Sequence, residues 1–155
     1  CVERSDPLTS DIELAATGIE ARIVAVVLVA GFRGAGIVVP LVHMELPEES
    51  FERIMSAGWK AISLVTWMEY LSYRDLREEY RVAFQELTRW IRVIEIRRRD
   101  APLLETTIEI RIRFGLRLPD AIIAATAKAH RATLLTRDGH FDKLARAGFL
   151  SVEKV

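Results

Sequence analysis

The hydrophobic and polar positions of this chain alternate between short apolar runs and longer amphipathic stretches. The most regular part, residues 118–142, joins an alanine-rich stretch to a short apolar run at Ala132–Thr136. Apolar residues at helical spacing over Ile122–Ala129 predict a helix, which Pro119 suits as a first-turn residue. The apolar run has the length of a buried strand. This part of the chain is therefore expected to fold as a helix followed by a strand.

The same alternation predicts elements further upstream. Helices are expected at 47–58 and 74–90, and strands at Lys60–Val65 and Ile91–Ile96. Thr66 is expected to cap the helix after the first of these strands, with Glu69 completing a capping box. Residues 101–115 fit two patterns, because their isoleucines alternate as in a strand while other apolar positions fit a helix.

The first 45 residues contain two apolar runs. Ala21–Ala30 is rich in valine, as buried strands are, whereas Pro40 makes the run Gly36–Met44 a poor central strand. We expect one of these runs to pair with the strand ending at Val65. A membrane span is the alternative, but the uninterrupted run is shorter than the roughly 20 residues that a bilayer requires.

The order of elements, strand and helix in repetition, predicts a mostly parallel sheet covered on both faces, which is a three-layer α/β/α fold. We predict a poorly defined N-terminal segment at residues 1–20 and one domain at 21–155. Because the chain starts with Cys1 and not with methionine, we expect a fragment or a misread start. Its single cysteine excludes an internal disulfide framework and fits a reducing cytoplasm.

Charge alone points to no partner, since 22 basic and 22 acidic residues give a formal net charge of zero. The informative charges are three carboxylates near the predicted ends of strands and starts of helices, namely Glu69, Asp120 and Asp138. Each has a local explanation, as a cap, a first-turn acid or a turn residue. If they share one site, their oxygen atoms suit Mg²⁺ or Mn²⁺ and phosphodiester hydrolysis.

The motifs L-P-D-A-I-I-A-A-T-A at 118–127 and T-R-D-x-H-F-D at 136–142 resemble the C-terminal half of a PIN domain of the VapC-type toxin ribonucleases. The similarity extends upstream to A-I-S-L-V-T-W-M-E-Y-L at 61–71 and covers roughly residues 50–150. It implies a PIN-like α/β/α fold with a helix at 101–115. It also implies a cytoplasmic, metal-dependent endoribonuclease without a membrane segment, with RNA as substrate, a cognate antitoxin protein as partner and a homodimeric state.

The resemblance also implies a ligand set. Glu69, Asp120 and Asp138 match the family's second, third and fourth acidic positions, which act in catalysis and bind Mg²⁺ or Mn²⁺. Asp142 matches a further carboxylate that binds the metal through water. The first position, an aspartate in a D-x-N motif, does not occur in this chain, and Glu45 is the one acid placed to substitute. The alternative function is thus a catalytically impaired PIN-like module that binds an antitoxin or RNA.

The remaining candidate residues carry no pattern of their own. His130 and His140 lack a matched partner, and we interpret both as surface or packing residues. Trp59, Trp67 and Trp90 are expected in the core or an interface and not as base-stacking platforms.

Overall fold

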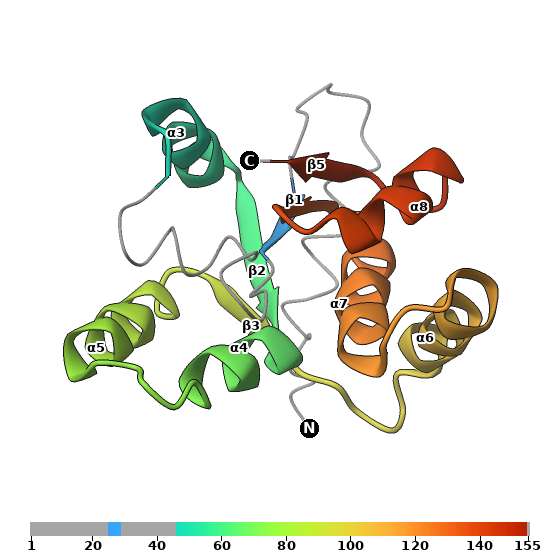
Figure 1. Ribbon diagram of the computed structural model, residues 1–155, viewed down its shortest axis with the longest axis horizontal. Helices are drawn as coiled ribbons and strands as arrows, with labels where there is room; N and C mark the ends of the chain where they lie inside the picture. Colours follow the sequence, from blue (N-terminus) through green and yellow to red (C-terminus); the bar gives the residue numbers. More distant parts are fainter. Residues whose placement is uncertain (1–24, 29–45, 155) are drawn as a thin grey trace, which may run out of the picture.

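In the part of the chain that the structure describes, five parallel strands form one central sheet (Figure 1). The computed structural model describes residues 25–28 and 46–154. The strands lie in the order β3-β2-β1-β4-β5. Their bounds are β1 Ala25–Leu28, β2 Trp59–Ser63, β3 Arg92–Ile94, β4 Thr133–Thr136 and β5 Val152–Lys154.

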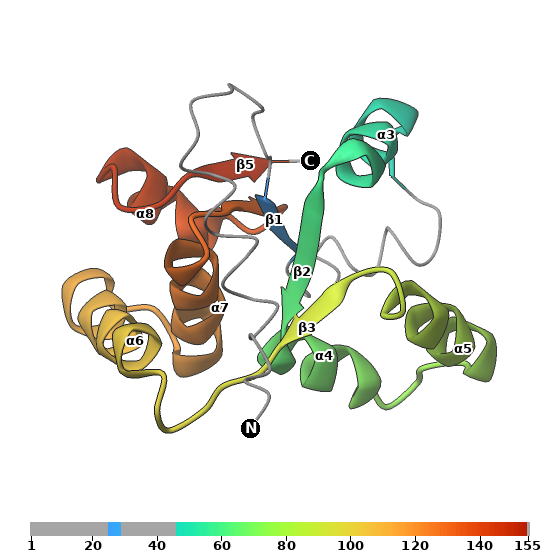
Figure 2. The same cartoon turned by 180° about the vertical axis from the view of Figure 1, so that it is seen from behind.

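Helices cover both faces of this sheet, as Figures 1 and 2 show from opposite sides. Helices α3 and α5 lie on one side, and α6, α7 and α8 lie on the other. The predicted three-layer α/β/α fold is thereby confirmed. The bounds are α3 Glu48–Ser56, α4 Leu64–Leu71, α5 Glu78–Leu87, α6 Ala101–Phe114, α7 Leu118–Ala129, the 3₁₀ turn η2 Gly139–Phe141 and α8 Asp142–Arg146.

Two hydrophobic clusters hold the layers together. Successive side chains of a strand point to opposite faces, so Leu134 of β4 packs with Ile123 of α7 and Leu144 of α8. Its neighbour Leu135 packs in the second cluster, with Phe84 of α5. The apolar run that predicted β4 is therefore buried on both sides, as parallel strands are.

The first apolar run enters the sheet as predicted. Strand β1 pairs in parallel with β2 and with β4, and Leu28 is level with Ile62 on one side and Leu135 on the other. The second run and residues 1–20 lie outside the described residues, and the division of the chain at residue 21 stays a prediction. No helix in the described part of the chain is long and apolar enough to cross a membrane.

The predicted capping box at Thr66 and Glu69 is wrong. Helix α4 begins directly after β2, and Ser63 is its N-cap, accepting a hydrogen bond from the Val65 backbone N–H at 3.2 Å. Thr66 lies inside the helix and is fully buried. Because Ser63 caps α4, the carboxylate of Glu69 is not part of the helix cap.

The long helix predicted at 74–90 is shorter, since α5 spans Glu78–Leu87. Its apolar face does pack as expected, with Phe84 fully buried against Tyr70 of α4. Trp90 lies beyond the helix and is 79% exposed, so it does not belong to the core. Trp59 and Trp67 are partly buried against the two clusters, as predicted.

The helix that the resemblance implied at 101–115 is confirmed as α6, although the alternating isoleucines favour a strand. It ends at Gly115, which takes the left-handed conformation (φ 62°) that glycine adopts without strain. Ile110 is buried, whereas Ile108 and Ile112 are exposed. The alternation thus arises because this helix carries apolar residues on its outer face as well as its inner one.

Candidate active site

Three of the predicted acidic residues come from elements that meet at one edge of the sheet. Helix α4 starts at the carboxyl end of β2, and Asp138 follows the carboxyl end of β4. Helix α7 precedes β4 and runs back along the sheet, so its first turn, with Asp120, lies at that same edge. The chain order reverses between β1 and β4, which is where α/β sheets bind ligands.

Glu69 is a partly buried carboxyl group with a perturbed affinity for protons. Burial, and secondly the negative charge of Asp120, raise its pKa from 4.5 to about 7. Such a shift means that burial has removed water from the ionised side chain and that a like charge lies near it. The described residues supply no hydrogen bond to its carboxylate. The buried hydroxyl of Thr66, one turn earlier in α4, also has no hydrogen-bond partner there.

Asp120 lies in the first turn of α7, and burial and several neighbouring charges act on its carboxyl group. Burial is the main cause that raises the pKa of its carboxyl group, and Asp138 raises it further. His140, Arg117 and Lys143 act in the opposite direction. The negative charge of Asp120 therefore acts on Glu69, and the negative charge of Asp138 acts on Asp120.

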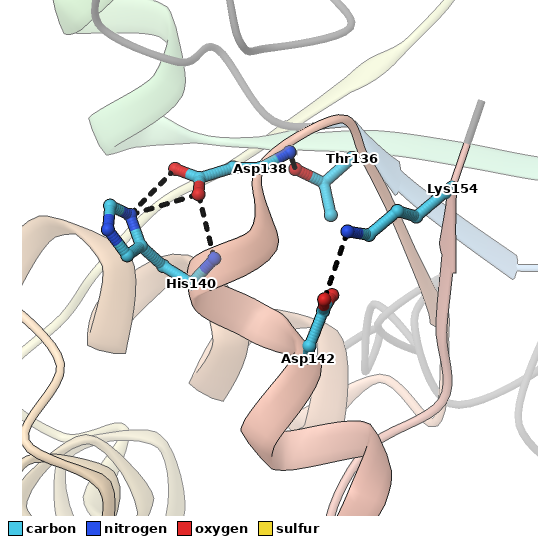
Figure 3. Close-up of polar contacts among 5 residues, drawn as sticks. All are labelled: Thr136, Asp138, His140, Asp142 and Lys154. Atoms are coloured by element: carbon cyan, nitrogen blue, oxygen red, sulfur yellow. Dashed lines mark hydrogen bonds and ion pairs between the residues drawn. The ribbon is translucent and has the colours of Figure 1, made fainter.

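Asp138 is held in a turn that its own side chain stabilises (Figure 3). Its backbone N–H donates to Thr136 Oγ1 at 2.9 Å, and its Oδ1 accepts from the His140 backbone N–H at 2.8 Å. The His140 ring lies on the same carboxylate, with Nδ1 2.9 Å from Oδ1 and 3.2 Å from Oδ2. His140 lies on the surface as predicted, with its side chain 73% exposed, but the expectation that it lacks a partner is wrong. Its position two residues after an aspartate was the signal for this contact.

Asp142 belongs to a different contact. Its Oδ2 is 3.0 Å from Lys154 Nζ of β5, and the carboxylates of Asp138 and Asp142 point to different partners in Figure 3. Lys154 could not be singled out beforehand, because the pair joins two elements that are separate along the chain. Asp142 is thus already neutralised by a lysine, which fits an outer position at the site better than direct metal binding.

The donor atoms of this edge fit a hard divalent cation. Glu69 and Asp120 supply only carboxylate oxygens, and their pKa values are raised by burial and, secondly, by neighbouring negative charge, which Mg²⁺ or Mn²⁺ would neutralise. Within residues 25–28 and 46–154, no group of three or more His, Cys, Asp or Glu side chains is close enough to hold an ion. The fit is therefore to the Glu69–Asp120 pair, with Asp138 next to it.

The first acidic position of the expected ligand set has no counterpart in the sequence after β1. The strand ends at Leu28, and Val29, Ala30 and Gly31 follow it. Glu45, the acid that was considered as a substitute, lies outside the described residues. The strand that would bring the first ligand to the centre of the sheet edge is present, but the carboxylate is not.

His130 is a packing residue, as predicted. His130 stacks on Trp59 with ring centroids 5.2 Å apart. Burial, and secondly the charge of Arg92, lower its pKa, while Asp100 acts in the opposite direction. It lies at the opposite end of α7 from Asp120 and takes no part in the acidic edge.

The PIN domain family model matches residues 37–147, and the chain belongs to that family. The match begins after β1, the strand that lacks the D-x-N aspartate. This result confirms the family that the motifs at 61–71, 118–127 and 136–142 indicated. No protein of curated function matches the sequence.

Solved structures of toxin–antitoxin proteins share the fold. VapBC2 from Rickettsia felis, bound to a promoter DNA fragment, has a TM-score of 0.62 at 20% identity, covering 77% of this chain and 93% of that one. DNA-bound VapBC from Salmonella typhimurium has a TM-score of 0.62 at 17% identity, covering 84% and 98%. A toxin–antitoxin complex from Klebsiella pneumoniae has a TM-score of 0.56 at 27% identity, covering 83% and 95%.

Proposed function

We propose that this chain is the toxin of a toxin–antitoxin pair and cleaves RNA endonucleolytically with Mg²⁺ or Mn²⁺. Membership of the PIN domain family and the similarity to the Klebsiella pneumoniae toxin–antitoxin complex support the class. The observation that carries the proposal is the pair Glu69–Asp120 at the sheet's switch point, two partly buried carboxyl groups whose pKa values are both raised, chiefly by burial.

In this proposal, Glu69, Asp120 and Asp138 hold the metal and carry catalysis, and Asp142 contributes through water. A bound divalent cation supplies an activated water and stabilises charge on the leaving oxygen. Arg117, exposed at the N-cap of α7, and Lys143, in α8, are placed to attract the substrate's phosphates, since both act electrostatically on Asp120.

The missing first carboxylate determines how strong this activity should be. With one of four ligands absent, we expect metal binding and cleavage to be weak. Mn²⁺ should serve better than Mg²⁺, because Mg²⁺ demands a nearly ideal octahedral arrangement of ligands. The proposed place of action is the cytoplasm, with a cognate antitoxin protein that blocks the site.

A homodimer is part of the proposal, and α6 offers a surface for a second copy of the chain. Ile108 and Ile112 are 58% and 78% exposed and lie on a shallow apolar surface between Glu105 and Arg113. Arg111 lies further along the same helix. Among the described residues, neither Glu105 nor Arg111 has an ion-pair partner.

An antiparallel pairing of two α6 helices would satisfy both the apolar and the charged residues. With the two-fold axis at Ile108, this residue meets its own copy, and Glu105 of each chain lies opposite Arg111 of the other. The acid precedes the axis and the base follows it, so the helix is complementary to itself. A second copy is therefore the occupant that this surface fits.

RNA cleavage by the purified chain tests the proposed function. Single-stranded RNA should be cut with Mn²⁺, more slowly with Mg²⁺, and not at all with EDTA. Asp120→Asn should abolish the cleavage while the far-UV circular dichroism spectrum is retained, because the amide keeps the shape and removes the charge that binds the cation. Cleavage that survives both EDTA and Asp120→Asn would exclude the mechanism. A folded protein without any cleavage would leave only a binding role.

A further inference from the structure

The turn after β4 contains two kinds of contact to the same carboxylate. One comes from the backbone, since the His140 N–H donates to Asp138 Oδ1 at 2.8 Å. The other comes from the His140 ring, whose Nδ1 is 2.9 Å from Oδ1 and 3.2 Å from Oδ2 (Figure 3). The backbone contact is enough to form the turn. The ring contact therefore needs a separate explanation.

We propose that His140 is a positioning residue, which fixes the orientation of the Asp138 carboxylate for binding a divalent cation. This inference rests on the proposed metal-dependent function and assigns a role within that site to a residue outside the carboxylate ligand set. The role belongs to the ring, because any residue except proline would supply the backbone N–H at this position.

The contacts hold the carboxylate at both of its oxygens. An ionised carboxylate only accepts hydrogen bonds, and each of its oxygens has about two lone pairs. Oδ1 of Asp138 accepts from the backbone N–H, and the ring Nδ1 lies 2.9 Å from it. The ring makes its hydrogen bond to Oδ2, at 3.2 Å. The orientation of the carboxylate is thus fixed, and each oxygen keeps an acceptor position for a cation.

A fixed carboxylate matters more in this chain than in one with a full ligand set. Glu69 and Asp120 form the pair that fits a cation, and the strand end where a first ligand is expected carries Val29 instead. Asp138 is then the third carboxylate of the proposed ligand set. If its side chain rotates freely, the cost of ordering it reduces the affinity for the metal.

The chain also provides a matched control. Lys154 makes the same kind of contact to Asp142, at 3.0 Å, in the same part of the structure. Replacing Lys154 by methionine removes a charged partner of a neighbouring carboxylate and leaves Asp138 and His140 unchanged. A general effect of altering charge near the site would appear in both variants, whereas a positioning effect would appear only at His140.

The test measures Mn²⁺ affinity directly, by electron paramagnetic resonance titration of free Mn²⁺ against the full chain. His140→Ala should weaken binding about tenfold, the size of effect typical of residues that orient metal ligands. His140→Asn should stay within about threefold of the wild type, because its side-chain amide can donate to the same oxygen. Lys154→Met should also stay within about threefold. Without metal, the melting temperature of His140→Ala should change by no more than about 3 °C, since exposed contacts contribute little stability.

Each outcome decides a different claim. Equal Mn²⁺ affinity for the wild type and His140→Ala overturns the positioning role and leaves the proposed function intact. Equal losses of Mn²⁺ affinity in His140→Ala and Lys154→Met also overturn the positioning role, because a general charge effect then explains both losses. A wild-type chain that binds no Mn²⁺ overturns the proposed metal-dependent function, and the positioning role with it.

Discussion

Replacing Glu69 by glutamine should make the metal-free protein more stable at pH 8. The ionised carboxylate of Glu69 is partly buried and repelled by Asp120, so its ionisation lowers the stability of the folded chain. Glutamine keeps the size and polarity of the side chain but never ionises. The substitution removes a proposed metal ligand and at the same time relieves an electrostatic penalty.

The pKa of Glu69 gives the sign and the size of the effect. The folded value of about 7 lies above the ordinary 4.5, so the folded chain binds this proton more tightly than the unfolded chain. Stability must therefore decrease as pH rises from about 4.5 to about 7, and the full cost is present above pH 7. The difference between these two pKa values corresponds to about 3 kcal/mol in the free energy of unfolding. Because the side chain is only partly buried, solvent screening reduces the expected gain to about 1–2 kcal/mol.

Urea unfolding with EDTA present measures this gain. At pH 8 the glutamine variant should be about 1–2 kcal/mol more stable than the wild type, and at pH 4.5 the two should be nearly equal. Glu52→Gln, at an exposed position of α3, is the control and should change stability by less than about 0.5 kcal/mol at either pH. Saturating Mn²⁺ should reverse the order, since it binds only the wild-type pair well. Equal stability at pH 8, or a gain that persists at pH 4.5, would refute the reasoning.

Three further predictions follow from contacts elsewhere in the chain. Asp142→Asn should reduce the initial rate of Mn²⁺-dependent RNA cleavage by less than about tenfold, whereas a direct ligand would cost more. Ile108→Glu should convert the dimer to a monomer in sedimentation equilibrium, and Val82→Glu, at another exposed apolar position, should not; a monomeric wild type would reject the interface. Phe84→Ala should lower the free energy of unfolding by about 3–5 kcal/mol in urea, because the ring is fully buried. A loss below about 1 kcal/mol would show that this cluster does not support the fold.

The fold could be predicted from the sequence where local patterns decide the structure. The helix of α7 and the strand β4 follow from an alanine-rich amphipathic stretch and a short apolar run. The α/β class follows from the order of these elements. Element ends were less accurate, because the cap of α4 depends on where β2 leaves the sheet, and Ser63 reaches that point before Thr66 does.

The acidic residues could be named from motifs, but their surroundings could not. The contact between His140 and Asp138 depends on the conformation of a tight turn, and the pair Asp142–Lys154 depends on how β5 lies beside β4. Neither arrangement leaves a periodic trace in the sequence. The raised pKa of Glu69 likewise depends on how far α4 and α7 bury that edge, which is a property of tertiary packing.

The most direct test of the metal site is a crystal structure of the chain grown with Mn²⁺, with the ion located by its anomalous scattering. We predict a single strong anomalous peak between the carboxylates of Glu69 and Asp120, with a carboxylate oxygen of Asp138 as the next protein oxygen. The peak should disappear in crystals of Asp120→Asn grown under the same conditions. A peak at any other part of the surface, or an undiminished peak in Asp120→Asn, would contradict the assignment of this edge of the sheet as the metal site.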